Sequence, residues 1–188
     1  MNHAPSSHWQ QAISRSTQDF LDAFSHLSVQ DLNWKATPDQ WSVGQVIDHL
    51  ITTNKQYFPL FDQILAGKYK PRFYEQLPLL PRLFGKLILH SVQPETQRKT
   101  PTVPVFEPSI SEIPATILEN FRLEQNRLQD YIGQLLDVPI HSIIITSPAN
   151  QIVIYSLKYA LDIITAHEQR HFLQAERILE QYQAFSQN

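Results

Sequence analysis

Residues 42–67 read SVGQVIDHLITTNKQYFPLFDQILAG, and this stretch decides the fold of the chain. It opens with a capping box, in which the side chains of Ser42 and Gln45 can each satisfy the other residue's free backbone amide. Apolar residues then recur at three- and four-residue spacing, which is the period of one helix face. Pro59 removes one backbone hydrogen bond and is expected to kink the helix, and Gly67 is expected to end it. The stretch therefore predicts one long amphipathic helix.

Three further segments show the same helical period. They span about 7–27, 111–136 and 151–182. Eight of the 13 prolines lie between Pro71 and Pro114, so regular structure should be interrupted there, apart from a short helix that starts near Pro81. The run at 143–146 (Ile-Ile-Ile-Thr) is strand-like, but a lone strand cannot form a sheet, so we expect a buried connection.

These patterns predict a single all-α domain over residues 1–188, since no repeat or linker divides the chain. Four amphipathic helices of this length bury their apolar faces most simply as a four-helix bundle. The proline-rich loop and its short helix would then be inserted between the second and third long helices.

Composition excludes several function classes. Fifteen Lys and Arg against 18 Asp and Glu give a net charge of −3, so no global positive field recruits nucleic acid or an anionic membrane. Cysteine is absent, which excludes disulfides, a thiolate nucleophile, zinc fingers and iron–sulfur clusters. Any metal must be held by His, Asp or Glu. With no run of about 18 apolar residues and no leader-like start, we expect a soluble, cytoplasmic protein.

Two histidines, His167 and His171, are spaced so that they share one face of the last predicted helix. Imidazoles at this spacing can share a cation, and both lie in line with the helix's apolar stripe, which predicts that they face the interior. Each imidazole could instead bond to a backbone carbonyl or a tyrosine hydroxyl, because buried polar groups need partners. His49 lies at the flank of the apolar stripe of residues 42–67, and periodicity alone leaves open whether it is a third ligand or a surface residue. The other histidines are expected to be solvated: His3, His8, His26, His90 and His141.

The string His167-Glu168-Gln169-Arg170-His171 also matches the HExxH motif of zincin metalloproteases, in which Glu168 would be the general base. Only 17 residues follow His171, which leaves little room for a downstream third ligand. No edge strand is evident to bind an extended peptide. These two observations argue against a protease.

Two short motifs resemble those of the DinB-like (DinB/YfiT) superfamily. Residues 37–50, with Trp41-Ser42 and His49-Leu50, resemble its W-S-x-x-x-x-x-x-H-L signature, and His167-x-x-x-His171-x-x-Gln174 resembles its C-terminal H-x-x-x-H-x-x-Q signature. Residues 99–108 resemble the family's middle loop. The order and separation of the motifs match over nearly the whole chain.

This resemblance implies a four-helix bundle that holds a divalent metal, usually zinc or nickel, on His49, His167 and His171. Members with an assigned activity include transferases that add low-molecular-weight thiols, such as bacillithiol, mycothiol or glutathione, to electrophiles. Relatives include maleylpyruvate isomerase, many members are labelled only as hydrolases, and homodimers are common. We therefore expect a thiol S-transferase or a hydrolase acting on a small molecule; the alternative is a non-catalytic metal-binding or stress-response module.

Three further residues are candidates for supporting the site. Glu168 and Gln174 could orient a ligand imidazole through its free N–H, and Tyr57 could donate a hydrogen bond into the site. Glu168 could instead be an exposed carboxylate paired with Arg or Lys, and Tyr57 could be a core aromatic residue. With no cysteine and no Gly-x-Ser-x-Gly elbow, we expect the nucleophile to come from outside the protein and to be activated at the metal.

The segment 68–99 is basic, with seven Lys and Arg against two Glu. It could be a lid whose cations attract an anionic thiol toward the metal. It could instead be a solvated loop whose lysines and arginines serve solubility.

Overall fold

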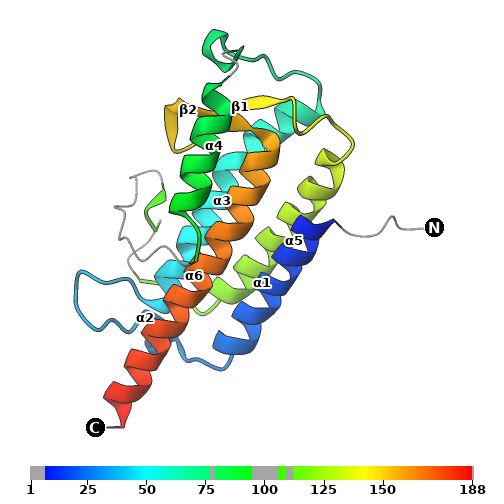
Figure 1. The fold of residues 1–188 in the computed structure, drawn as a ribbon. Helices are drawn as coiled ribbons and strands as arrows, with labels where there is room; N and C mark the ends of the chain where they lie inside the picture. Colours follow the sequence, from blue (N-terminus) through cyan, green and yellow to red (C-terminus); the bar gives the residue numbers. More distant parts are fainter. Residues whose placement is uncertain (1–6, 77–78, 95–105, 109–111, 188) are drawn as a thin grey trace, which may run out of the picture.

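Four long helices dominate the computed structural model, which describes residues 7–76, 79–94, 106–108 and 112–187. These are α1 (His8–Phe24), α3 (Val43–Leu65), α5 (Ile117–Leu135) and α6 (Leu157–Ser186). Each packs against two of the others, and they run side by side in Figure 1. The described residues also form α2 (Val29–Asn33), the short 3-10 helix η1 (Phe73–Gln76), α4 (Leu80–Ser91) and the strands β1 (Ile144–Ser147) and β2 (Asn150–Ser156). The chain is thus mostly helical, as its sequence predicts.

The sequence predicts α3 well. Ser42 and Gln45 form both bonds of the capping box, each 3.2 Å long. The helix continues through Pro59, and the chain leaves it at Gly67, whose φ of +64° is the left-handed conformation that favours glycine. At Gly44 the helix lies so close to Ile113 that an added Cβ would be 2.8 Å from the Ile113 Cγ2.

The prediction of a buried connection at residues 143–146 is wrong. Strand β1 pairs with β2 in an antiparallel hairpin, with Ile145 opposite Tyr155. The sequence pattern places residues 151–156 in the last helix and so conceals the partner strand, because a short apolar run fits either structure. Helix α6 begins only at Leu157, where the Ser156 side chain accepts a hydrogen bond from the Tyr159 amide.

One other boundary and one additional helix differ from the expectation. Helix α5 begins at Ile117, and the apolar pattern does not predict α2. The short helix expected near Pro81 is α4, which packs against β2 and α6. Part of the basic segment 68–99 and most of the loop 99–108 lie outside the described residues. None of the helices that the structure describes is both long and apolar enough to cross a membrane.

The apolar core consists of two clusters of buried side chains, one toward each end of the long helices. The first cluster includes Trp9, Ile13, Tyr57, Phe61, Leu128, Ile132, Leu135 and Ile164. The second cluster includes Phe20, Phe24, Leu50, Phe121, Ala175 and Ile178. On each of the four long helices, a buried polar residue lies between the members of one cluster and those of the other.

These four residues, called the polar layer below, are Ser16 of α1, Asn54 of α3, Gln125 of α5 and Glu168 of α6. Asn54 Nδ2 and Gln125 Nε2 donate hydrogen bonds to Glu168 Oε1, at 2.8 and 2.7 Å. The middle of the helical core is therefore polar, and Glu168 Oε1 links α6 to α3 and α5 there.

Candidate metal centre

Three histidines from two helices meet next to the polar layer. His49 lies on α3, and His167 and His171 lie one turn apart on α6. His49 Nε2 is 3.3 Å from His167 Nε2 and 3.2 Å from His171 Nε2, and the last two atoms are 3.0 Å apart. His49 and His171 are buried and His167 is partly buried. The three Nε2 atoms therefore surround one point from two helices.

The spacing of these nitrogen atoms suits a metal ion. Zinc–imidazole bonds of about 2.0–2.1 Å at tetrahedral angles place ligand nitrogens about 3.3–3.4 Å apart. Right-angled ligands at about 2.1 Å would be about 3.0 Å apart. The observed separations of 3.0–3.3 Å lie in this range. Three His ligands would also leave at least one coordination position open, as in catalytic zinc sites.

His49 is oriented by the backbone of a distant segment. Its Nδ1 contacts the carbonyl oxygen of Phe106, so Nδ1–H is the donor and Nε2 keeps a free lone pair. A hydrogen bond of this kind fixes the tautomer and the ring orientation of a metal-ligating histidine. Sequence reasoning misses Phe106, because a backbone carbonyl has no sequence signature. The feature of the sequence that points to the segment around Phe106 is the resemblance of residues 99–108 to the family's middle loop.

Trp41 covers two of the three imidazoles. Its ring centroid lies 4.9 Å from that of His49 and 6.4 Å from that of His171, and it is stacked on the latter at 23°. Trp41 directly precedes the cap residue Ser42, so the start of α3 fixes its position. The indole thereby shields the cluster on one side, which reduces its contact with water.

Burial keeps the imidazoles neutral. Desolvation lowers the pKa of His49 to about 4, although the Phe106 carbonyl and the Asp48 carboxylate partly oppose this. Desolvation also lowers the pKa of His167 and of His171 well below the usual value, and the neighbouring imidazoles add to the effect. Neutral imidazoles are the form that binds metals. The site is thus held in its metal-binding protonation state at neutral pH.

The other sequence candidates lie in different surroundings. Glu168 is fully buried, which corrects its reading as an exposed carboxylate, and its hydrogen bonds among the described residues go to the polar layer and not to the histidines. The Gln174 side chain lies near His171 and favours that residue's charged form. The Tyr57 hydroxyl lies 2.9 Å from that of Tyr155 in the apolar core.

Most of the remaining histidines lie on the surface. His8, His26, His90 and His141 are exposed, as the sequence suggests, and His3 lies outside the described residues. Among the described residues, the only cluster of His, Cys, Asp or Glu suited to a metal is that of His49, His167 and His171.

Comparison with known proteins identifies the family. No curated protein and no solved structure shows significant similarity to the chain. A family model of the DinB superfamily matches residues 12–175, a span that includes all three clustered histidines and most of the helical core. On this match, the chain belongs to the DinB superfamily.

Proposed function

We propose that His49, His167 and His171 hold one divalent cation, zinc or nickel, and that the protein is a metal-dependent enzyme acting on a small molecule. The observation that carries the proposal is the convergence of three Nε2 atoms within 3.0–3.3 Å of one another. Because the Phe106 contact keeps the proton of His49 on Nδ1, the Nε2 lone pair of His49 points at the other two Nε2 atoms in a desolvated site, where a cation would accept it. Membership of the DinB superfamily supports the same reading.

The chain's own residues prepare this site. The Phe106 carbonyl accepts a hydrogen bond from the Nδ1–H group of His49, which directs the Nε2 lone pair inward. Trp41 limits the access of water to His49 and His171. When bound, a divalent cation lowers the pKa of a coordinated thiol or water, so that a nucleophile is available near neutral pH.

We favour thiol S-transfer, with a bacillithiol- or glutathione-like thiol, over hydrolysis. With no cysteine and no Gly-x-Ser-x-Gly elbow, the chain offers no evident nucleophile of its own, and the family resemblance points to thiols. The position of Glu168 argues against a zincin protease, since its carboxylate is hydrogen-bonded in the polar layer instead of serving as a base beside the histidines. We also infer that α1, α3, α5 and α6 form the family's four-helix bundle, with a homodimer as the expected assembly.

The first test is metal analysis of protein purified without a chelator or a His tag. We expect about one zinc or nickel ion per chain, and loss of most of it in His167→Ala/His171→Ala. His141→Ala is the matched control, because His141 is exposed and lies outside the cluster. Stoichiometric metal retained in the double variant would refute the site.

The second test separates the reaction classes. Metal-loaded protein is incubated with a panel of thiols and a chromogenic electrophile, and in parallel with ester and amide substrates. Metal-dependent consumption of both thiol and electrophile supports the transferase. Metal-dependent hydrolysis alone would assign a hydrolase, and metal binding with no turnover would favour a non-catalytic module.

A further inference from the structure

We propose that the chain has a second small-molecule site, for an anionic ligand with an aromatic or apolar body, in a cavity between α4, β1 and the start of α6. The cavity has a volume of about 840 Å³. Pockets of about 300–1,000 Å³ suit small ligands. Its lining includes Tyr69, Arg82, Ile143, Lys158 and Tyr159.

This cavity is separate from the histidine cluster. Tyr159 precedes His167 by eight residues on α6, which corresponds to about 12 Å along a helix. On α3, Ile64 lines the cavity and follows His49 by 15 residues, or about 22 Å. None of the three histidines lines it. The inference therefore does not depend on the proposed metal chemistry.

The carboxylate in the cavity wall already has its hydrogen bonds. Glu75 is buried and accepts bonds from the Tyr69 hydroxyl, the Thr146 hydroxyl and the Arg72 amide, at 2.6–2.9 Å. Both carboxyl oxygens thus already have donors within the protein, and the side chain acts as part of the wall. A ligand need not supply a cation for it.

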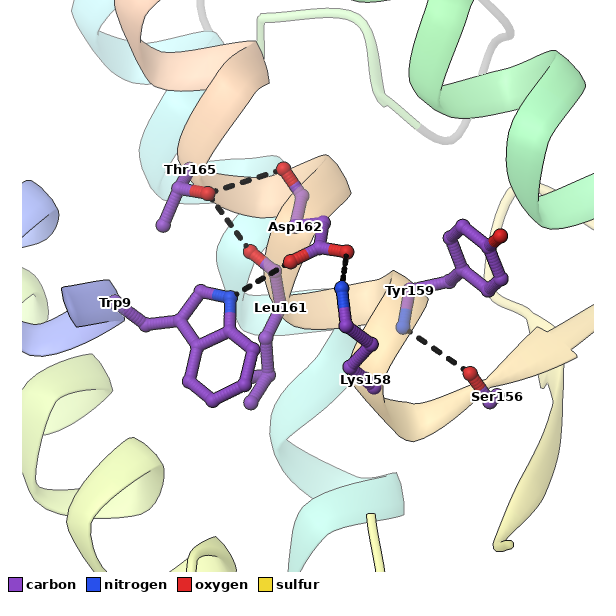
Figure 2. Close-up of polar contacts among 7 residues, drawn as sticks. All are labelled: Trp9, Ser156, Lys158, Tyr159, Leu161, Asp162 and Thr165. Atoms are coloured by element: carbon purple, nitrogen blue, oxygen red, sulfur yellow. Dashed lines mark hydrogen bonds and ion pairs between the residues drawn. The ribbon is translucent and has the colours of Figure 1, made fainter. Parts of the chain in front are cut away.

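One cationic side chain in the cavity lining, that of Lys158, is already paired with a carboxylate. Lys158 Nζ lies 2.5 Å from Asp162 Oδ2, while the other oxygen of Asp162 accepts a 2.9 Å bond from the Trp9 indole N–H. Figure 2 shows Asp162 between these two donors, with the Tyr159 ring directed toward α4. Lys158 is therefore held by Asp162, which leaves Arg82, a permanently charged side chain, as the main candidate to pair with an anion, beside the exposed imidazole of His141.

Arg82 lies at the exposed edge of the cavity. In the part of the chain that the structure describes, no ion pair joins it to a carboxylate. The backbone amides at the start of α6 are not available to an anion, because those of Leu157 and Lys158 bond to the carbonyls of Ile143 and Ile140. An anionic group would consequently be recognised by a side chain, and Arg82 presents a planar set of donors that suits carboxylates.

Tyr159 provides a fixed aromatic wall. Helix α4 passes so close to it that a Cβ on Gly85 would lie 2.5 Å from Tyr159 Cδ2. The ring is thus packed against the backbone of α4, beside a cavity whose lining also contains the apolar side chains of Ile64, Ile143 and Ile144. An apolar or aromatic ligand body would bury its surface there.

The test uses naphthalene-2-carboxylate and its uncharged isostere naphthalene-2-carboxamide, titrated into the full chain by calorimetry. We expect the carboxylate to bind more tightly, and Arg82→Gln to weaken its binding about tenfold. Lys86→Gln is the matched control, since it removes a charge from the same helix outside the cavity lining. Its carboxylate affinity should match that of the parent chain.

A blocking variant tests the location. Ser142 is exposed and lines the cavity, so Ser142→Trp should fill the opening and abolish binding without changing the melting temperature. Equal affinity for both probes, equal effects of Arg82→Gln and Lys86→Gln, or unchanged binding to a folded Ser142→Trp variant would overturn the proposal. Repeating the titration with metal-free protein separates this result from the metal site, because binding here should persist.

Discussion

At the scale of single residues, Glu168 shows how a motif can mislead. Its place between His167 and His171 in an HExxH string suggests a catalytic base, yet its side chain lies in the polar layer with Asn54 and Gln125. Adjacent residues on a helix point about 100° apart, so a neighbour of a ligand need not face the same site. The sequence locates Glu168 in the motif, but the packing of four helices decides what it contacts.

The burial of Glu168 predicts a pH effect on stability. Desolvation raises its pKa from 4.5 to about 7, although bonds from Gln125 and Asn54 oppose this. Between these values the folded chain holds a proton that the unfolded chain releases, so the stability contributed by this carboxyl is present below pH 4.5 and is lost as the pH rises through 7. The Glu168→Gln variant has no titrating group at this position, so it should not lose this stability as the pH rises.

Urea unfolding of the chelator-treated proteins measures the effect. The stability of Glu168→Gln relative to the parent chain should rise by about 3 kcal/mol between about pH 4.5 and about pH 8. Glu180→Gln, an exposed change on the same helix, should show no such trend. A pH-independent difference for Glu168→Gln would contradict the raised pKa.

At the scale of elements, α3 depends on its first turn. The Ser42 hydroxyl oxygen accepts a hydrogen bond from the Gln45 backbone amide. Because Ser42 is buried, water cannot replace this hydrogen bond when the hydroxyl is removed. Ser42→Ala should lower the free energy of unfolding by about 1–2 kcal/mol. Chemical denaturation measures this loss, and Ser186→Ala at the exposed end of α6 should change stability by less than about 0.5 kcal/mol. A neutral Ser42→Ala would show that packing alone holds the start of α3.

The elements also show what sequence can predict. Apolar periodicity, together with the capping box of α3 and Pro81 near the start of α4, locates α1, α3 and α4 to within a few residues, because these signals are local. The hairpin escapes prediction because residues 150–156 pair with a strand whose own signal is equally short. The contact of Phe106 with His49 depends on a backbone atom 57 positions away, and no side-chain pattern encodes it.

At the scale of the whole molecule, a bound metal should stabilise the fold. A cation that binds only the native state at about 1,000 times its dissociation constant adds about 4 kcal/mol. For a chain of this size that corresponds to a melting temperature about 10 °C higher. Adding a chelator should lower the melting temperature of the parent chain by this amount. The melting temperature of the His167→Ala/His171→Ala variant should not change. An identical melting curve with and without chelator would indicate a weak or empty site.

The polar layer also sets the alignment of the helices along their axes. Sliding α6 by one turn along α3, about 5.4 Å, would carry Glu168 away from Asn54 and leave a carboxylate unpaired in the apolar core. The same slip would carry His167 and His171 away from His49. The misalignment that would separate the three imidazoles therefore also leaves Glu168 unpaired, so the polar layer favours the one helix alignment that assembles the candidate metal site.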